Sequence, residues 1–246
     1  MTATLADPIA EFDGMPFLDD SFNARRLLAA IAAVRYVKGR DLGVGGHITR
    51  EGIEQWLAPA QAILLHPGAE PIPARPLGPR RQADVQGALA MVAGAMPTWS
   101  DLLALPTRFA LLYPPTGAVS ASRRMWPQHV LLSGEAFDSA QVLAELALLE
   151  LTHQWLYLLL ELWALQLPEA TEHTLPSGTT GRQPWEVLGA AHVSLALARL
   201  YTHIPQQAKR VGPLRTYAAG CLDSLASRPE LTPAGERVAQ RLKEEL

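Results

Sequence analysis

The spacing of apolar and polar positions predicts a chain that is mostly helical. Thr49, Pro184 and Thr232 are residue types typical of helix starts, and Pro59 is expected to kink or split the helix that follows Thr49. The first dozen residues show no helical pattern and are expected to be frayed. Apolar residues recur at helical spacing in residues 20–39, 49–65, 83–96, 99–105, 142–167, 184–203, 213–227 and 233–246.

Two short apolar runs, residues 109–113 and 129–132, flank a Pro-Pro-Thr-Gly turn and predict one small β-hairpin. Residues 66–81 contain five prolines, three arginines and two glycines, which favours an extended surface loop, either functional or mobile. The expected fold class is therefore mainly α (α+β), a single helical domain around a buried central helix. An N-terminal helical region, 1–107, and a second helical region, 108–246, are expected to form one compact domain.

The central helix, residues 142–167, is the most apolar part of the chain and is long enough to raise the question of a membrane span. Glu145, Glu150, His153 and Glu161 interrupt it, and ionised carboxylates at that depth in a bilayer are costly. The sequence therefore predicts a core helix and no membrane partner. Asp138 or Ser139 is its expected N-cap.

A narrow polar stripe follows this helix. At about 100° per residue, Glu150, His153, Gln154, Tyr157 and Glu161 share one arc of about 100°. A helix this apolar is expected to be enclosed, so the stripe faces either solvent along one edge or an internal cavity. In a cavity, Glu150 and His153 at i, i+3 can converge on one metal ion, whereas Glu161 lies too far along the helix to share it.

Charge and cysteine content exclude several classes of protein. The 246 residues carry 21 Lys+Arg against 24 Asp+Glu, and the basic residues are scattered in short pairs, so no nucleic acid partner is expected. The single Cys221 excludes a disulfide framework and a cysteine-rich zinc site and fits a reducing compartment. Residues 1–13 hold no basic residue, unlike a secretory signal. We expect a cytoplasmic protein.

Residues 145–154 carry a resemblance to a known family. They read Glu-Leu-Ala-Leu-Leu-Glu-Leu-Thr-His-Gln, which resembles the Glu-x-x-x-His-Glu-x-x-His-Gln segment of the HExxH peptide-modification proteins. Those proteins occur with ribosomally made peptide natural products, and some are 2-oxoglutarate-dependent peptide β-hydroxylases. Residues 127–133, 181–193 and 231–235 resemble other stretches of the family in order and spacing, so the similarity covers roughly residue 108 onward. It implies Fe(II) and 2-oxoglutarate as cofactors. A peptide substrate, a precursor peptide or a second biosynthetic protein is the implied partner.

The chain departs from the family at two ligand positions. Leu149 replaces the first histidine of the motif, and Gly189 replaces a histidine expected in the later helix. Glu150 and His153 remain, and His192 lies about one helical turn beyond Gly189, where it is a candidate substitute ligand. A mononuclear iron site needs about three protein ligands, and leucine cannot be one of them.

Three hypotheses stay open from the sequence. In the first, an active enzyme holds iron through Glu150, His153 and His192, and Arg182 binds the 2-oxoglutarate carboxylate. In the second, the protein is a metal-free pseudoenzyme that binds a peptide or a partner protein. In the third, Glu150 and His153 perform acid–base chemistry without a metal. Further pocket candidates are Leu149, Tyr157, Glu161, Gly189 and Arg199.

Overall fold

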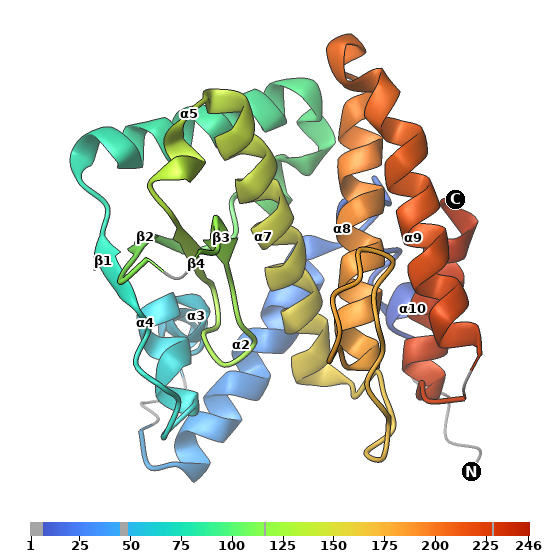
Figure 1. Ribbon diagram of the computed structural model, residues 1–246. Coiled ribbons are helices and arrows are strands. Elements are labelled where there is room, and N and C mark those ends of the chain that lie inside the picture. The colour runs from blue at the N-terminus through green and yellow to red at the C-terminus, as the bar shows by residue number, and fades with distance from the viewer. Residues whose placement is uncertain (1–6, 45–48, 116, 228) are drawn as a thin grey trace. The chain divides into compact units, whose positions relative to one another are not determined.

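The computed structural model describes residues 7–44, 49–115, 117–227 and 229–246 (Figure 1). Over these residues the chain is mainly helical with a small sheet, as the sequence predicts. The helices are α1 Pro8–Glu11, α2 Ala24–Asp41, α3 Arg50–Glu54, α4 Pro59–Ala62, α5 Pro79–Ala95, α6 Ser100–Leu103, α7 Ala140–Leu162, α8 Pro184–Thr202, α9 Val211–Ala226 and α10 Pro233–Glu244. The strands are β1 Ala74–Pro76, β2 Arg108–Leu112, β3 Ser120–Ala121 and β4 His129–Leu132.

Local sequence signals set several helix starts. The hydroxyls of Thr49, Ser139 and Thr232 each accept a hydrogen bond from the backbone N–H three residues later, at 2.9, 3.1 and 3.1 Å. These residues cap α3, α7 and α10. Pro59 occupies the first position of α4, where its missing N–H costs nothing, and so splits the predicted helix after Thr49.

The predicted β-hairpin is wrong, because β2 and β4 run parallel to each other. Arg108 lies opposite His129, and Leu111 opposite Leu132. The connection of residues 113–128 is long enough to carry the chain back to the start of the next strand, as a parallel pair requires. All four positions of β4 are buried, the pattern of a strand covered on both faces.

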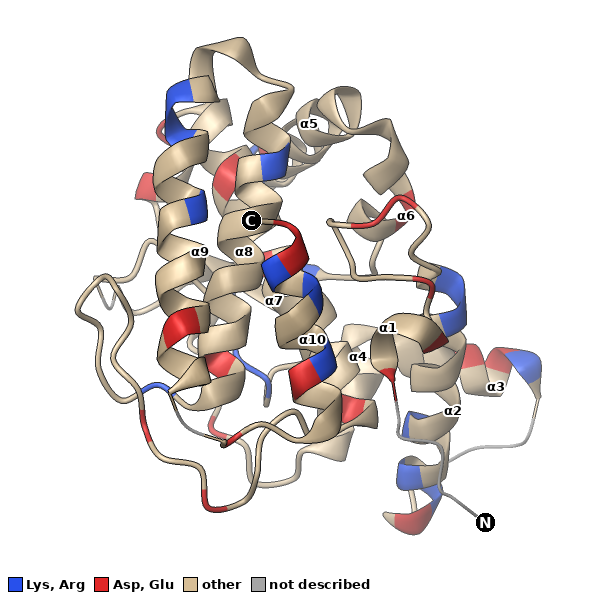
Figure 2. Ribbon diagram, turned by 90° about the vertical axis from the view of Figure 1, so that its right-hand side faces the viewer, with Lys and Arg blue, Asp and Glu red and all other residues tan. Residues whose placement is uncertain are grey.

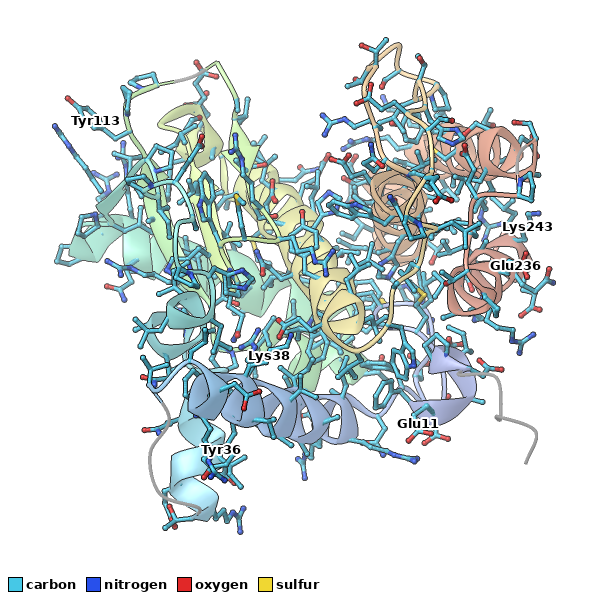
Figure 3. All side chains as sticks on the ribbon, turned by 90° about the horizontal axis from the view of Figure 1, so that it is seen from below. Glu11, Tyr36, Lys38, Tyr113, Glu236 and Lys243 are labelled. Carbon is cyan, nitrogen blue, oxygen red and sulfur yellow. The ribbon has the colours of Figure 1, made fainter. Side chains whose placement is uncertain are left out.

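The outer strands complete a sheet of order β1-β2-β4-β3. β3 pairs antiparallel with β4, and β1, which falls in the proline-rich segment 66–81, pairs antiparallel with β2. Pro76 is compatible with β1 because an edge strand leaves one side unpaired. The guanidinium of Arg75 lies 3.3 Å from the ring centroid of Tyr113, a side chain directed away from the sheet (Figure 3). The segment thus supplies an edge strand as well as a connection.

The chain divides into two compact units. Residues 24–158 contain the sheet and are called the sheet unit; residues 1–23 with 159–246 are called the helical unit. The predicted division at residue 107 falls inside the sheet unit, where β1, from before it, pairs with β2, from after it. In the helical unit α8 and α9 lie side by side, and α10 contacts both (Figure 1).

The expectation of a frayed N-terminus is wrong from residue 7 onward. Asp7 caps α1 by accepting hydrogen bonds from the backbone N–H groups of Ile9 and Ala10, and the residues after α1 are buried. The signal was missed because this segment is too short and irregular for helical periodicity to reveal its packing. Residues 1–6 lie outside the described residues.

Among the described residues, α7 is the single helix whose length and apolar composition would allow it to cross a membrane. Most of its apolar stretch is buried, which fits the predicted core helix.

Candidate functional site

At Glu150 the polar stripe of α7 faces the sheet, and the carboxylate lies neither in open solvent nor in an empty cavity. This side chain is 4% exposed, and both carboxylate oxygens accept hydrogen bonds. The hydroxyl of Ser120, in β3, donates to Oε1 at 2.6 Å, and the hydroxyl of Ser122 donates to Oε2 at 2.5 Å. Charge-assisted bonds of this kind compensate much of the cost of burying a carboxylate. Glu150 therefore fastens α7 to the edge of the sheet.

One turn further along, Gln154 belongs to a separate buried network. Its Oε1 accepts from the backbone N–H of Gln128 at 2.7 Å, and its Nε2 donates to the carbonyl of His129 at 3.1 Å. Gln128 in turn donates through Nε2 to the carbonyls of Leu57 and Pro106 and accepts from Arg35 at 2.5 Å. Arg35, Gln128 and Gln154 are each at most 1% exposed. They hold the start of β4 in place and have no access to a substrate.

Three of the remaining α7 candidates are half-buried, and the fourth, Tyr157, is buried at 7% exposed. His153 is half-buried, and its ring stacks on Tyr157 with 6.1 Å between centroids and 11° between planes. Leu149 is also half-buried. Glu161 is half-buried on the last turn of α7, in the part of that helix that belongs to the helical unit. Of the predicted stripe, the structure therefore brings His153 and Tyr157 together and commits Glu150 and Gln154 to hydrogen bonds with the sheet and its loops.

Two of the candidates on α8 bind residues that precede α2 in the sequence. His192 is fully buried, and its Nε2 lies 2.7 Å from the carbonyl oxygen of Pro16. A carbonyl can only accept, so this nitrogen carries the proton and is not a metal ligand in this arrangement. Arg199 donates to Asp20 at 2.8 Å. Gly189 is buried in the same helix.

Arg182, the expected 2-oxoglutarate residue, lies just before α8. Its Nη1 donates to Oε1 of Glu186 at 3.0 Å, and Oε2 of Glu186 accepts from the backbone N–H of Gln183 at 2.9 Å. Gln183 and Glu186 form the capping box of α8. The side chain of Arg182 is 42% exposed. Its contact with Glu186 ties the loop before α8 to the first turn of that helix.

The donor set does not fit a mononuclear iron centre. Two of the family's imidazole positions are Leu149 and Gly189, which supply no ligand, and Glu150 already uses both oxygens for serine hydroxyls. Among the described residues no group of three or more His, Cys, Asp or Glu side chains is arranged to hold a metal ion. Glu150 and His153 fall short of the roughly three protein ligands that such a site needs.

Two other features were not predicted. In the loop of residues 163–183, His173 Nε2 lies 2.7 Å from Oε2 of Glu230. The hydroxyl and backbone N–H of Thr171 donate to Oε1 of the same carboxylate at 2.6 and 3.0 Å. The Thr171 hydroxyl, followed by its amide and by His173, lowers the pKa of Glu230 to about 2. This cluster fastens the loop to the connection between α9 and α10.

The second feature is a groove of about 470 Å³ in the sheet unit. Its walls combine apolar side chains with two glutamines, a threonine and one arginine. Leu77 places the end of the proline-rich segment in this wall. The other residues that line it are Ala58, Pro59, Ala60, Gln82, Val85, Gln86, Pro106, Thr107, Arg108 and Phe109.

Comparison with protein-family models and with curated proteins finds no match to this chain. The resemblance to the HExxH peptide-modification proteins therefore rests on the residues quoted above. No local sequence signal could have revealed the partners of Glu150, because Ser120 and Ser122 are about thirty residues away and reach it only through β3.

Proposed function

We propose that this protein is an HExxH-like peptide-modification protein of a ribosomal peptide natural-product pathway, with a degenerate metal site. In this proposal it acts in the cytoplasm as a pseudoenzyme that binds a peptide or a partner protein without a metal. The observation that carries the proposal is the state of Glu150. The motif's acid is 4% exposed and bonded through both oxygens to serine hydroxyls, which is a structural use of the residue.

The ligand positions support the same conclusion. Leu149 and Gly189 stand where the family has imidazoles, and the protonated Nε2 of His192 is engaged by a backbone carbonyl. Changes in groups that only orient a metal ligand already weaken affinity by about 10–100-fold. Loss of two ligands therefore costs more than that, and the protein is expected to hold no metal at cellular concentrations.

Metal analysis of the full chain tests this proposal. Protein purified without chelators is expected to contain well below one iron or zinc ion per chain. Near-stoichiometric metal that is lost in Glu150→Gln would refute the degenerate site and favour an enzyme with shifted ligands. Activity that survives chelation but is lost in Glu150→Gln would instead favour metal-free acid–base chemistry.

A gain-of-binding variant tests the resemblance itself. Leu149→His places two imidazoles at i, i+4 on α7, where neighbouring side chains can share one ion. Leu149 is half-buried, so the new ring has room to reach the helix surface. We expect zinc affinity to rise at least about tenfold. Val142→His, at a 41% exposed position near the start of the same helix, is the matched control. Equal zinc affinity in the two variants would contradict the resemblance.

A further inference from the structure

Residues 7–22, here called the N-terminal segment, are held by the helical unit in the manner of a bound peptide. Apart from the single turn of α1, the segment has no helix or strand. Four of its apolar side chains are nevertheless almost completely buried, with exposed fractions of 2% for Phe12, 0% for Met15, 0% for Phe17 and 1% for Leu18. Phe12 packs edge to face on Trp163 with 5.5 Å between ring centroids. Buried aromatic and apolar anchors carry most of the affinity in such recognition.

The charges of the segment and of the helices that hold it are complementary. The segment contains five acidic residues and no lysine or arginine. Figure 2 shows α1 beside α10, whose charged residues are coloured. Three arginines of α8 and α10 pair with aspartates of the segment: Arg241 with Asp19 through two nitrogens at 2.8 and 2.9 Å, Arg237 with Asp7 at 2.8 Å, and Arg199 with Asp20 at 2.8 Å. The two-point contact of Arg241 fixes direction as well as position.

The backbone of the segment is recognised too. His192 donates to the carbonyl of Pro16, and Asp13 and Phe17 have φ values of 57° and 62°. Left-handed backbone is rare for residues other than glycine, and for phenylalanine it is unfavourable in a free chain. The surrounding helices therefore impose this conformation, as a binding site imposes one on a peptide.

We infer that the surface of α8, α10 and Trp163, here called the cradle, is a site for an acidic and apolar peptide supplied in trans. The N-terminal segment is its occupant in cis. The contacts define the class of ligand. It is a peptide with the pattern Asp-x4-Phe-x2-Met-x-Phe-Leu-Asp-Asp, which residues 7–20 carry. This inference rests on the proposed function, to which it adds the place and the chemistry of peptide binding.

The covalent connection between the N-terminal segment and α2, here called the tether, regulates access to such a site. Asn23 alone separates the segment from α2, so one short stretch of chain holds it at high local concentration. A peptide in trans binds only the fraction of molecules whose segment has left the cradle, and its apparent affinity falls by that fraction. Release of the segment therefore controls access to the cradle.

Cutting the tether tests the inference. A protease site is inserted between Asn23 and Ala24 of the full chain, and binding of a fluorescein-labelled peptide of residues 7–22 is measured by anisotropy before and after cleavage. We expect the cleaved chain to bind at least about 100-fold more tightly than the uncut chain. A second peptide keeps the anchors and aspartates of the pattern, Phe17 included, and has serine or glutamine elsewhere, with glycine at position 13. It should bind within about threefold of the first.

Two variants of the cleaved chain distinguish specific binding at the cradle from nonspecific attraction between opposite charges. Arg241→Gln removes the two-point contact with Asp19 and should weaken the labelled peptide at least about tenfold. Lys243→Gln is the matched control, because Lys243 lies on α10 as Arg241 does, but its side chain is exposed and extends into solvent (Figure 3). It should change the affinity less than about twofold.

Failure of exchange would overturn the inference. If the cleaved chain stays folded and the labelled peptide neither binds nor replaces the cut segment, the segment is only part of the fold. If cleavage unfolds the chain, Gly14→Ala in the uncut chain decides. A Cβ at position 14 would lie 2.4 Å from Cβ of Asp19, which loosens that contact, and the peptide must then bind at least about tenfold more tightly than to the wild type. An unchanged affinity of Gly14→Ala for the labelled peptide would overturn the inference. Metal bound to wild-type protein would refute the proposed function, but it would not contradict peptide binding at the cradle.

Discussion

Gln128 is the residue whose loss should disturb the sheet unit most. It is fully buried, and its side chain joins three parts of the unit by accepting from Arg35 and donating to the carbonyls of Leu57 and Pro106. Gln128→Ala removes these three hydrogen bonds and leaves both carbonyls buried. At about 1 kcal/mol for each neutral bond and about 2 for the bond to the guanidinium, the expected loss of unfolding free energy is about 4 kcal/mol.

The backbone at this position adds a second, independent test. Gln128 has φ = 58°, a conformation that disfavours any residue with a Cβ. Gln128→Gly should therefore be more stable than Gln128→Ala by about 0.5–1 kcal/mol, the reverse of the usual order of these residues. Gln86→Ala, at an exposed site on α5, is the control and should stay within about 0.5 kcal/mol of wild type.

Urea unfolding followed by tryptophan fluorescence measures these changes, since four of the six tryptophans lie between residues 24 and 158. A loss below about 1 kcal/mol in Gln128→Ala would show that the network is not a structural anchor. An alanine variant as stable as the glycine variant would contradict the argument from φ.

Three further predictions concern other parts of the molecule. The lowered pKa of Glu230, about 2, means that its contact with Thr171 is at full strength above pH 4.5 and is lost as pH falls towards 2. Hydrogen-exchange protection of the Thr171 amide should follow that curve in wild type and be independent of pH in Glu230→Gln. Burial raises the pKa of the Cys221 thiol to about 11, so mass spectrometry should detect maleimide labelling at pH 7.5 only after unfolding in urea. Gly39→Ala would put a Cβ 2.3 Å from the Trp56 ring and should cost about 1–3 kcal/mol in a thermal melt. Gly87→Ala, in a helix with open space around it, should instead stabilise by about 0.5–1 kcal/mol, and equal effects would refute the steric argument.

Much of the helical fold could be predicted because its signals are local. Caps at Thr49, Ser139 and Thr232, and proline at the start of α4 and α8, act within one turn of the chain. The apolar content of α7 likewise predicts its burial. The direction of β4 relative to β2 could not be predicted in the same way, because hairpin and parallel pairings place the same residues in strands.

The candidate site shows the same limit. Helical geometry correctly places Glu150, His153 and Tyr157 on neighbouring turns, but it says nothing of what faces them. The partners of Glu150 come from β3 and the residue just after it, and those of His192 and Arg199 are residues 16 and 20. A carboxylate available for chemistry and one held by two serines have identical sequence patterns.

The sequence by itself determined where several helices begin, which helix is most apolar, and which side chains share a face, since these depend on contacts within a few residues. Only the tertiary structure decided that the motif's acid is bonded to the sheet, that β2 and β4 run parallel, and that residues 7–20 are held by α8 and α10. The physical reason is that hydrogen bonds and apolar burial depend on distance in space. Residues 7 and 237, which pair at 2.8 Å, are almost the full length of the chain apart.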